Sequence, residues 1–351
     1  MNTDMKEALV DVSVLILFFN RPKQLGQVFE QVRKARPSRL FLYQDGPRNE
    51  KDLPGIMACR EIVRDIDWEC EVHTSFQEKN SGCDPSNYLA QKWAFSISDK
   101  CIALEDDSIP SVSFFHFCKE MLDKYEHDPR ITMITGFNLE EETKDIKEDY
   151  FFSAHLCIWG WASWRRVLDQ WDEHYTWLED EQAIRQLKEH IKERGIRDDF
   201  LLMSRRHKDQ HKAFYESIFW SYLMLNNGLC ITPKRNLINN LGATADSTHY
   251  GSNLNTLPRG FRRLFTMKRF ELDAYSADAE THKPLIHPKY IIENISYRHR
   301  AYRILGWMCP WVKIARSFEE LLLNIRYGSA SAIKTALKNR IKKWMGKKEY
   351  N

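Results

Sequence analysis

The chain opens with short apolar runs that alternate with amphipathic stretches. Val14–Phe19 is a continuous run of β-prone residues, which is typical of a parallel strand covered on both faces. Pro22 then opens a helical pattern, and Leu40–Tyr43 is a second short strand that ends in a Gln-Asp-Gly-Pro turn signal. A helix near Ile56–Arg64 and a strand near Glu69–Thr74 continue the alternation. The pattern predicts βαβ units, and therefore an α/β fold with a mostly parallel sheet flanked by helices.

The next apolar run ends in an acid cluster. A loop at Asn80–Pro85 and a helix near Tyr88–Ser98 lead into residues 101–107, which read Cys-Ile-Ala-Leu-Glu-Asp-Asp. Three adjacent carboxylates at the end of a buried strand repel one another, so we expect a positive charge nearby. A hard divalent cation that holds a diphosphate would satisfy this need. An acidic turn that caps the following helix, Ser111–Glu126, is the simpler interpretation of the same pattern.

Polar residues follow each of the first strands in the same way. Asn20–Arg21, Gln44–Asp45 and Glu105–Asp107 all come directly after a predicted strand. In open parallel sheets, ligands bind beyond the carboxyl ends of the strands, so one cleft could collect all three groups. Simpler interpretations exist, since Asp45 could belong to an ordinary Asp-Gly turn and Arg21 could be a solvated residue at a helix start.

The pattern changes after the acid cluster and its helix. Further strands are expected at Ile131–Thr135, Tyr150–Ile158 and Cys230–Pro233, and further helices over Glu179–Lys212 and Tyr215–Leu225. Beyond Leu257 the chain becomes basic and the alternation stops. We therefore predict a domain of residues 1–257, with halves at 12–138 and 139–257, and a basic, mainly helical C-terminal extension at 258–351.

Composition and charge narrow the class of protein. The 351 residues are 43% hydrophobic and carry a formal net charge of +3, which indicates a folded protein without general affinity for nucleic acid. None of the eight cysteines forms a Cys-x-x-Cys pair, which argues against a zinc knuckle. Most lie in apolar runs, as reduced core cysteines do, so a cytoplasmic location is expected. No apolar run approaches the roughly 20 residues of a membrane span.

The last part of the chain is strongly basic. Residues 331–351 carry seven Lys or Arg side chains and one acid. Apolar residues recur there at near-helical spacing, at Ile333, Leu337, Ile341 and Trp344. Such a helix could lie on an anionic membrane surface, where a lipid-linked substrate would be found. A solvated terminal helix explains the same spacing.

Taken in order, these motifs resemble those of a known group of enzymes. The series Asn-Arg-Pro, Gln-Asp, Glu-Asp-Asp and Gly-Trp is similar to the N-acetylglucosaminyltransferase I family of nucleotide-sugar glycosyltransferases. Trp159–Arg166 and Ala243–His249 resemble a bacterial group of hemolysin-like glycosyltransferases of surface-polysaccharide synthesis. The resemblance covers residues 12–250 and implies a GT-A fold, which is Rossmann-like. Residues 12–138 would be its donor-binding half and residues 139–257 its acceptor-side half.

The resemblance also implies roles for the residues at the strand ends. Asp107 would bind a metal ion, Mn²⁺ or Mg²⁺, while Asp106 would contact the ribose and Glu105 the donor sugar. Arg21 would reach the diphosphate or the nucleotide, and Asp45 the base. These roles are chemically reasonable, because a divalent ion with oxygen ligands neutralises a leaving diphosphate.

The same resemblance places a catalytic base at Glu216. Inverting transfer needs a carboxylate that takes the proton of the acceptor hydroxyl. In the family this acid lies about 17 residues before a proline-led strand, as Glu216 does before Pro233, although the family has Asp at that position. A surface glutamate in the first turn of a helix, favoured by the helix dipole, is the alternative.

Four further polar residues complete the predicted site. His249 would be a second metal ligand, because many GT-A enzymes supply a late histidine and neutral imidazole suits manganese. A surface histidine is the alternative. Asn20 belongs with its neighbour Arg21 to the donor site, and Asn87 and Asn138 are candidates for hydrogen bonds in the cleft.

The tryptophan-rich segment has two interpretations. Trp159–Trp164 could form the acceptor-side wall of the cleft, with indoles stacked on sugar faces, or could pack in the core. Gly160, next to Trp161, indicates a close backbone approach, which could be to the donor sugar.

The predicted activity is therefore transfer of a sugar from a nucleotide-diphosphate donor, such as a UDP-sugar, to a surface-polysaccharide or lipid-linked glycan, with inversion and a divalent metal. A nucleotidyltransferase that makes the activated sugar is one alternative, but Phe18–Lys23 lacks the glycines of a phosphate loop. A non-catalytic sugar- or lipid-binding protein is another. The absence of long apolar segments argues against a membrane pore.

Overall fold

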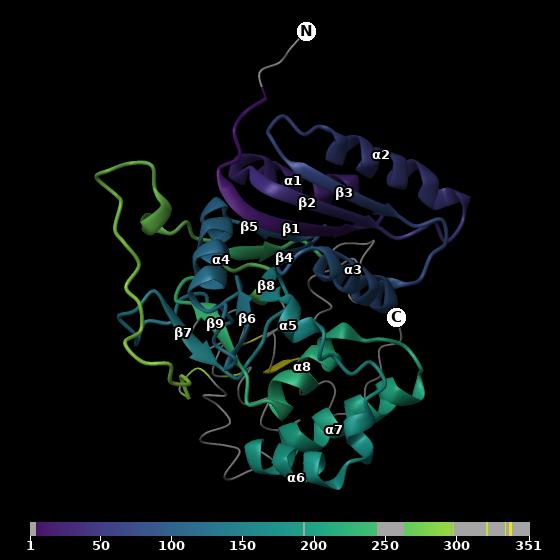
Figure 1. Cartoon of the computed structure of the whole chain (residues 1–351), viewed down its shortest axis with the longest axis vertical. Coiled ribbons are helices and arrows are strands. Elements are labelled where there is room, and N and C mark those ends of the chain that lie inside the picture. Colours follow the sequence, from purple (N-terminus) through teal and green to yellow (C-terminus); the bar gives the residue numbers. More distant parts are fainter. Residues whose placement is uncertain are drawn as a thin grey trace.

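The computed structural model describes residues 5–191, 194–243, 263–295 and 297, together with the isolated positions 321, 334, 337 and 338. Within these ranges, an eight-stranded sheet has the order β3-β2-β1-β4-β8-β6-β9-β7 (Figure 1). Neighbouring strands are parallel throughout its first half, which consists of β1 (Val10–Phe18), β2 (Pro37–Gln44), β3 (Glu71–Phe76) and β4 (Lys100–Glu105).

The second half of the sheet is mixed. The parallel pair β6 (Ile131–Thr135) and β9 (Leu229–Pro233) is flanked by two antiparallel strands, β8 (Trp161–Trp164) and β7 (Tyr150–Ser153). Strand β8 lies between β4 and β6 and pairs antiparallel with both of them. The predicted fold class, a Rossmann-like and mostly parallel α/β sheet flanked by helices, is confirmed.

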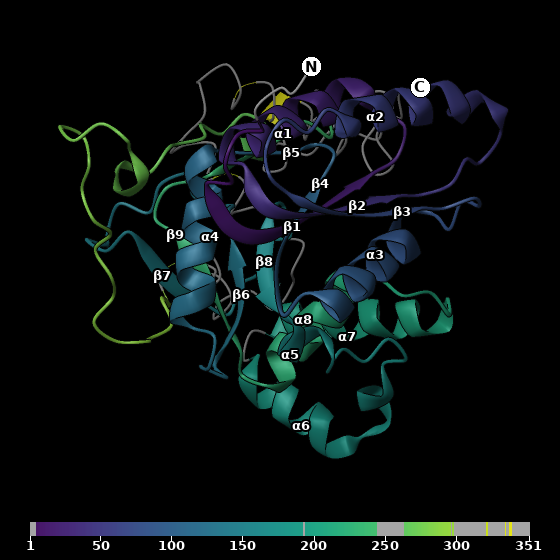
Figure 2. The same ribbon diagram turned by 45° about the horizontal axis from the view of Figure 1, so that its top comes forward.

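Helices cover both faces of the sheet. Helix α1 (Pro22–Ala35) contacts both α2 (Leu53–Arg64) and α4 (Val112–Lys124). Helix α3 (Cys83–Ile97) contacts α5 (Arg165–Leu168) and α8 (Tyr215–Leu225). Figure 2 shows α1 and α2 above strands β1–β3 and α3 below them. Two more helices, α6 (Glu181–His190) and α7 (Arg194–Asp209), lie with α8 at the lower end of the molecule in Figures 1 and 2.

The first strand and helix follow from their sequences. Val14, Leu15 and Ile16 have no exposed surface, because a sheet covered on both faces buries consecutive side chains. Helix α1 starts at Pro22, whose fixed φ suits the first turn. Its buried residues recur at helical spacing, and it ends before Arg36, which adopts a left-handed φ of 47°.

Two element boundaries differ from the sequence prediction. Helix α3 begins at Cys83 and not near Tyr88, because Pro85 is tolerated in a first helical turn, where no backbone partner is lost. Strand β7 ends at Ser153, and the tryptophan segment forms a separate strand, β8, in the middle of the sheet. Apolar runs alone do not tell where one strand stops and another begins.

The structure describes residues 263–295, 297 and four isolated positions of the predicted C-terminal extension, so its mainly helical character stays a prediction. Residues 265–295 contain one 3₁₀ turn, Asp273–Tyr275, and no α-helix. Glu271 caps α4, since its two carboxylate oxygens accept hydrogen bonds from the backbone N–H groups of Val112 (3.1 Å) and Ser113 (2.8 Å). The segment 331–351 lies outside the described residues except for three positions. Among the helices that the structure describes, none is long and apolar enough to cross a membrane.

A second, two-stranded sheet lies next to the acid cluster. Strand β5 (Ser108–Pro110) pairs antiparallel with β10 (Ile238–Asn240). The register places Asn240 opposite Ser108, the residue that follows the acid cluster. Asn240, which belongs to the predicted half 139–257, thereby reaches the sheet edge at which β4 ends.

Candidate functional site

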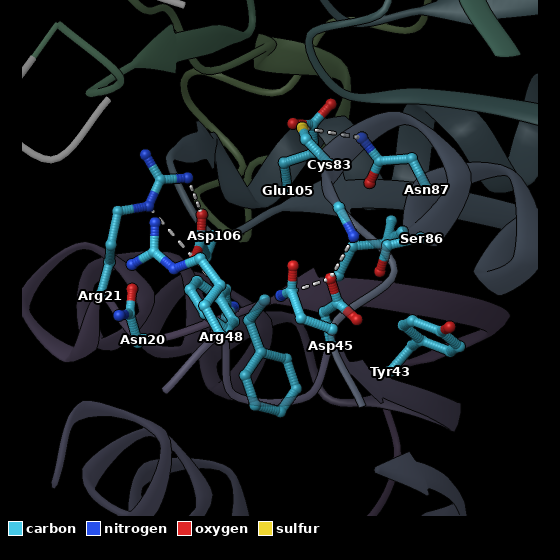
Figure 3. A pocket seen from close by; sticks show the side chains of 15 residues that line it. Asn20, Arg21, Tyr43, Asp45, Arg48, Cys83, Ser86, Asn87, Glu105 and Asp106 are labelled. Atoms are coloured by element: carbon cyan, nitrogen blue, oxygen red, sulfur yellow. Dashed lines mark hydrogen bonds and ion pairs between the residues drawn. The ribbon is translucent and has the colours of Figure 1, made fainter. Parts of the chain in front are cut away.

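A pocket of about 730 Å³ lies beyond the carboxyl ends of β1, β2 and β4. The strand register explains why these ends meet, because Phe18 pairs with Gln44 and Leu17 with Glu105. The loop before α3 and the first turn of that helix form the opposite wall. Figure 3 shows its main side chains, which are Asn20, Arg21, Tyr43, Asp45, Arg48, Cys83, Ser86, Asn87, Glu105 and Asp106. The predicted cleft that collects the three strand ends is therefore present.

Arg21 supplies the positive charge expected near the acid cluster. Its guanidinium makes an ion pair with Asp106, and its Nη1 lies 3.0 Å from Oδ2 of Asp107 (Figure 3 shows the contacts with Asp106). The side chains of Arg21 and Asp106 are only 17% and 4% exposed, so water screens this pair weakly. Burial raises the pKa of Asp106 and the Arg21 charge lowers it, and burial prevails.

Glu105 lines the pocket and contacts helix α8. The hydroxyl of Tyr215 donates a hydrogen bond of 3.1 Å to Oε1 of Glu105. Burial raises the pKa of Glu105 well above its usual range, and the nearby charges of Asp107 and Glu216 raise it further. The fold therefore brings Glu216, from the first turn of α8, close to the acid cluster. Glu216 itself is exposed, and its role as a base stays a prediction.

Asp107 contacts Arg21 but is not among the residues that line the pocket. Besides Arg21, it accepts a hydrogen bond of 3.3 Å from Nδ2 of Asn240, and Ser108 Oγ lies 3.4 Å away. The backbone of Gly242 passes close by, because a Cβ atom there would lie 2.7 Å from Oδ2 of Asp107. The second strand pair β5–β10 thus holds this carboxylate in place.

The carboxylates of the cluster offer few ligands for the expected metal ion. The described residues contain no group of three or more His, Cys, Asp or Glu side chains that could hold a metal. Asp107 offers one carboxylate, and magnesium commonly binds through one or two carboxylates together with substrate phosphates. The cluster therefore fits an ion that arrives with a diphosphate and does not form a cage for a resident ion. The predicted second ligand, His249, lies outside the described residues.

Asp45 holds the wall of the pocket together. Its Oδ1 accepts hydrogen bonds from the N–H groups of Gly46 and Ser81, both 2.9 Å long, and its Oδ2 accepts from Asn80 (2.9 Å) and Gly82 (3.1 Å). Burial raises its pKa, and these backbone hydrogen bonds oppose the rise. Asp45 therefore connects β2 to the loop before α3, and its proposed contact with a base stays a prediction.

Asn20 also has a structural partner. Its Nδ2 donates a hydrogen bond of 2.7 Å to Oδ1 of Asp52, which ends the 3₁₀ turn Glu50–Asp52. Asn87 lines the pocket on the opposite wall, where its Nδ2 lies 3.8 Å from Sγ of Cys83. The structure thus places both predicted asparagines at the pocket and adds Cys83, from the first turn of α3, which the sequence did not single out.

Two predicted positions do not reach the pocket. Trp161 is 1% exposed, stacks on Phe95 and meets Phe219 edge-on, so the prediction that its indole contacts a sugar is wrong. Gly160 has a left-handed φ of 68°, and a Cβ atom there would lie 2.6 Å from Cδ1 of Ile238. The close approach that its glycine permits is to the side chain of Ile238 and not to a donor sugar.

Asn138 is the third correction. This residue has no exposed surface, and its Nδ2 donates hydrogen bonds to the backbone oxygens of Pro233 (2.8 Å) and Lys234 (2.9 Å). The prediction that Asn138 lines the cleft is wrong, because its amide connects the ends of β6 and β9 within the protein interior.

Arg48 is a second arginine in the pocket, and it was not among the residues predicted from the sequence. Arg48 lies four residues after the end of β2, just beyond the Asp-Gly-Pro turn. Arg48 could have been predicted from the position of this turn. The turn follows the carboxyl end of β2, which lies at the same edge of the sheet as the end of β1, where Arg21 is found. Tyr43, the last but one residue of β2, also lines the pocket, and the same argument from the strand end would have predicted it.

The comparisons with known proteins assign no family to this chain. No protein-family model matches the chain, and no curated protein matches it. One solved structure that matches is described as a "putative glucose-1-phosphate thymidylyltransferase" from Bacillus anthracis in complex with sucrose. It is 9% identical, with a TM-score of 0.27, and the match covers 48% of this chain and 75% of that chain. A likeness of this size carries no argument about the fold or the function of this chain.

Proposed function

We propose that the protein is a glycosyltransferase that takes a sugar from a nucleotide-diphosphate donor, with UDP as the expected nucleotide. The observation that supports this best is the pocket itself, in which Arg21 lies between two carboxylates at the common end of three strands. Such a site combines a cation for phosphate with acids for a metal ion and for sugar hydroxyls. The acceptor would be a growing surface glycan or a lipid-linked glycan.

Most of these residues would bind the donor, and one would activate the acceptor. A Mn²⁺ or Mg²⁺ ion at Asp107 would neutralise the diphosphate as it leaves. Arg21 would bind the same diphosphate, and Asp106 and Glu105 would accept hydrogen bonds from hydroxyl groups of the ribose and the donor sugar. Glu216 would take the proton of the acceptor hydroxyl, in an inverting transfer. The proposed location is the cytoplasm, with membrane contact through residues 331–351 as a further prediction.

A thermal-shift screen tests the class. The full chain is mixed with UDP-, GDP-, dTDP- and CMP-sugars, with and without MnCl₂, and the melting temperature is measured. A ligand at a hundredfold excess over its Kd stabilises the folded state by about 2.7 kcal/mol, which is readily detected. We expect stabilisation by one nucleotide sugar that grows with manganese. No shift with any donor would contradict the proposal.

A product assay separates this activity from the nucleotidyltransferase alternative. The donor that binds is incubated with the protein, and released nucleoside diphosphate is measured. In parallel, a nucleoside triphosphate and a sugar 1-phosphate are supplied, and pyrophosphate is measured. Release of nucleoside diphosphate supports the proposal, whereas pyrophosphate from the second reaction would replace it. Binding without any turnover would favour a non-catalytic sugar-nucleotide-binding protein.

A further inference from the structure

Arg48 differs from Arg21 in how its guanidinium is held. The Nε and Nη2 atoms of Arg48 donate hydrogen bonds of 2.9 and 2.7 Å to the two carboxylate oxygens of Asp52, and its backbone N–H donates a third, of 3.0 Å. This two-pronged pairing fixes the plane of the guanidinium. Its Nη1 makes no hydrogen bond with any residue in the described ranges, and the Arg48 side chain is 60% exposed.

The partner of Arg48 is itself fixed. The Asp52 side chain is 6% exposed, and its Oδ1 also accepts the hydrogen bond from Asn20. A Cβ atom on Gly55 would lie 2.6 Å from the backbone oxygen of Asn20, so the start of α2 packs directly against this strand end. The hydrogen bonds from Arg48 lower the pKa of Asp52 to about 2, and Asp52 therefore stays ionised at any physiological pH.

One face of the planar Arg48 guanidinium is covered by an aromatic ring. Its Cζ lies 5.0 Å from the centre of the Phe19 ring, a distance typical of a cation–π contact. Phe19 directly follows β1 and also lines the pocket. The guanidinium is therefore held in a fixed orientation from two sides, which reduces the entropy lost when a ligand binds to it.

The two arginines are the cationic side chains that line the pocket within the described residues. Arg21 is engaged by two carboxylates, whereas Arg48 keeps donor atoms available. In Figure 3 both arginines lie towards one end of the pocket, with Tyr43, Asp45 and Ser86 towards the other. A nucleotide whose nucleoside occupies the Tyr43 end would extend its phosphates towards the arginine end.

We propose that Arg48 binds the terminal phosphate of the donor's nucleoside diphosphate and so makes the site selective for diphosphates over monophosphates. Asp52 and Asn20 are positioning residues, because they act on the ligand through Arg48. This inference rests on the proposed function and adds to it a residue that selects the phosphate chain length. A guanidinium suits this task, since its planar set of N–H donors matches two phosphate oxygens.

Titration calorimetry tests the inference on the full chain with MnCl₂ present. UDP, GDP, dTDP, ADP and CDP are each compared with the matching monophosphate, and the tightest pair is carried forward. For Arg48→Gln we expect Kd for the diphosphate to rise about tenfold, the usual effect of losing a charge-assisted hydrogen bond, and Kd for the monophosphate to change less than about twofold. Arg48→Lys keeps the positive charge but not the planar set of N–H donors, and should lose most of the selectivity for the diphosphate over the monophosphate.

Arg60 provides the matched control. Its guanidinium lies 4.7 Å from the centre of the Phe76 ring, and its Nε donates a hydrogen bond of 2.7 Å to Gln44, yet Arg60 does not line the pocket. Arg60→Gln should leave both dissociation constants unchanged. Asp52→Asn tests positioning, and should reduce the ratio of the two constants while monophosphate binding is retained.

The outcomes separate this inference from the proposed function. Equal losses of diphosphate and monophosphate affinity in Arg48→Gln, or no loss of either, would overturn the role of Arg48 and leave the proposed function standing. Failure of the wild-type protein to bind any of the nucleotides would overturn both. Because the readout is a ratio measured on one sample, partial misfolding of a variant does not imitate the expected result.

Discussion

The carboxyl end of β4 and the tryptophan strand β8 belong to neighbouring strands of one sheet, yet they direct their side chains differently. Glu105 and Asp106 leave β4 at its end and line the pocket. Trp161, the first residue of β8, pairs with Ala103, two residues inside the edge at which Glu105 ends β4, and both Trp161 and Trp164 are at most 2% exposed. Residues beyond a strand end are free to face a ligand, whereas residues inside a central strand face the helices packed on the sheet. Position relative to the strand end, and not residue type, separates the site from the core.

The largest expected effect concerns Glu216, which α8 brings towards the pocket edge. Replacing Glu216 with Gln should reduce the rate of transfer about a thousandfold, because a general base contributes roughly 10²–10⁴ to such a reaction. Donor affinity, measured by titration calorimetry, should be unchanged. Unaltered turnover would contradict the role of Glu216 as the base. The proposed site would then consist of residues at the ends of β1, β2 and β4.

Trp161→Ala tests whether the tryptophans of β8 belong to the core and not to the site. Because the indole is fully buried between Phe95 and Phe219, we expect a loss of about 4 kcal/mol in the free energy of unfolding, measured with urea. The Kd of the folded variant for the donor should equal that of the wild type. A variant of normal stability with weakened donor binding would show that the indole contacts the ligand after all.

Arg21→Gln removes the cation between two buried carboxylates. We expect a loss of about 3 kcal/mol in the free energy of unfolding, since breaking a buried ion pair leaves charges without a partner. Additional replacement of Asp106 with Asn should recover part of that loss. Arg64→Gln is the control, because the side chains of Arg64 and its partner Glu61 are 64% and 63% exposed and such pairs contribute less than about 1 kcal/mol. Equal losses in the two single variants would contradict the buried pairing.

The smallest predicted effect is a pH dependence in the helical layer next to the pocket. His207 stacks on Phe214 and its Nδ1 lies 2.7 Å from Oγ of Ser217, and burial lowers the pKa of His207. Below about pH 6.5 the unfolded chain binds a proton that the folded chain resists, so stability falls as the pH falls. His207→Gln should reduce the loss of stability between pH 7 and pH 5, measured by urea unfolding at the two pH values.

His174, which is 80% exposed, is the control for that measurement. Its replacement with Gln should leave the pH dependence of stability unchanged. If both variants behave alike, the pH dependence does not come from the packing of His207.

Much of the site could be predicted because it depends on local order along the chain. Buried strands identify themselves as apolar runs, and parallel strands align their carboxyl ends, so Arg21, Asp45 and Glu105 were expected to meet. The role of Asn138 could not be predicted in this way. Its amide is satisfied by backbone oxygens nearly one hundred positions away along the chain, and no local pattern encodes that distance.

The sequence by itself determined the alternation of strands and helices, the mostly parallel sheet and the acid cluster at the end of β4. It also required a cation beside three adjacent carboxylates, because their repulsion is a property of spacing alone. Only the tertiary structure decided that Arg21 is that cation, that Arg48 is held by Asp52 at the same pocket, and that Trp161 faces the core. These outcomes depend on strand order and on which face each helix covers, and both arise from packing between distant segments.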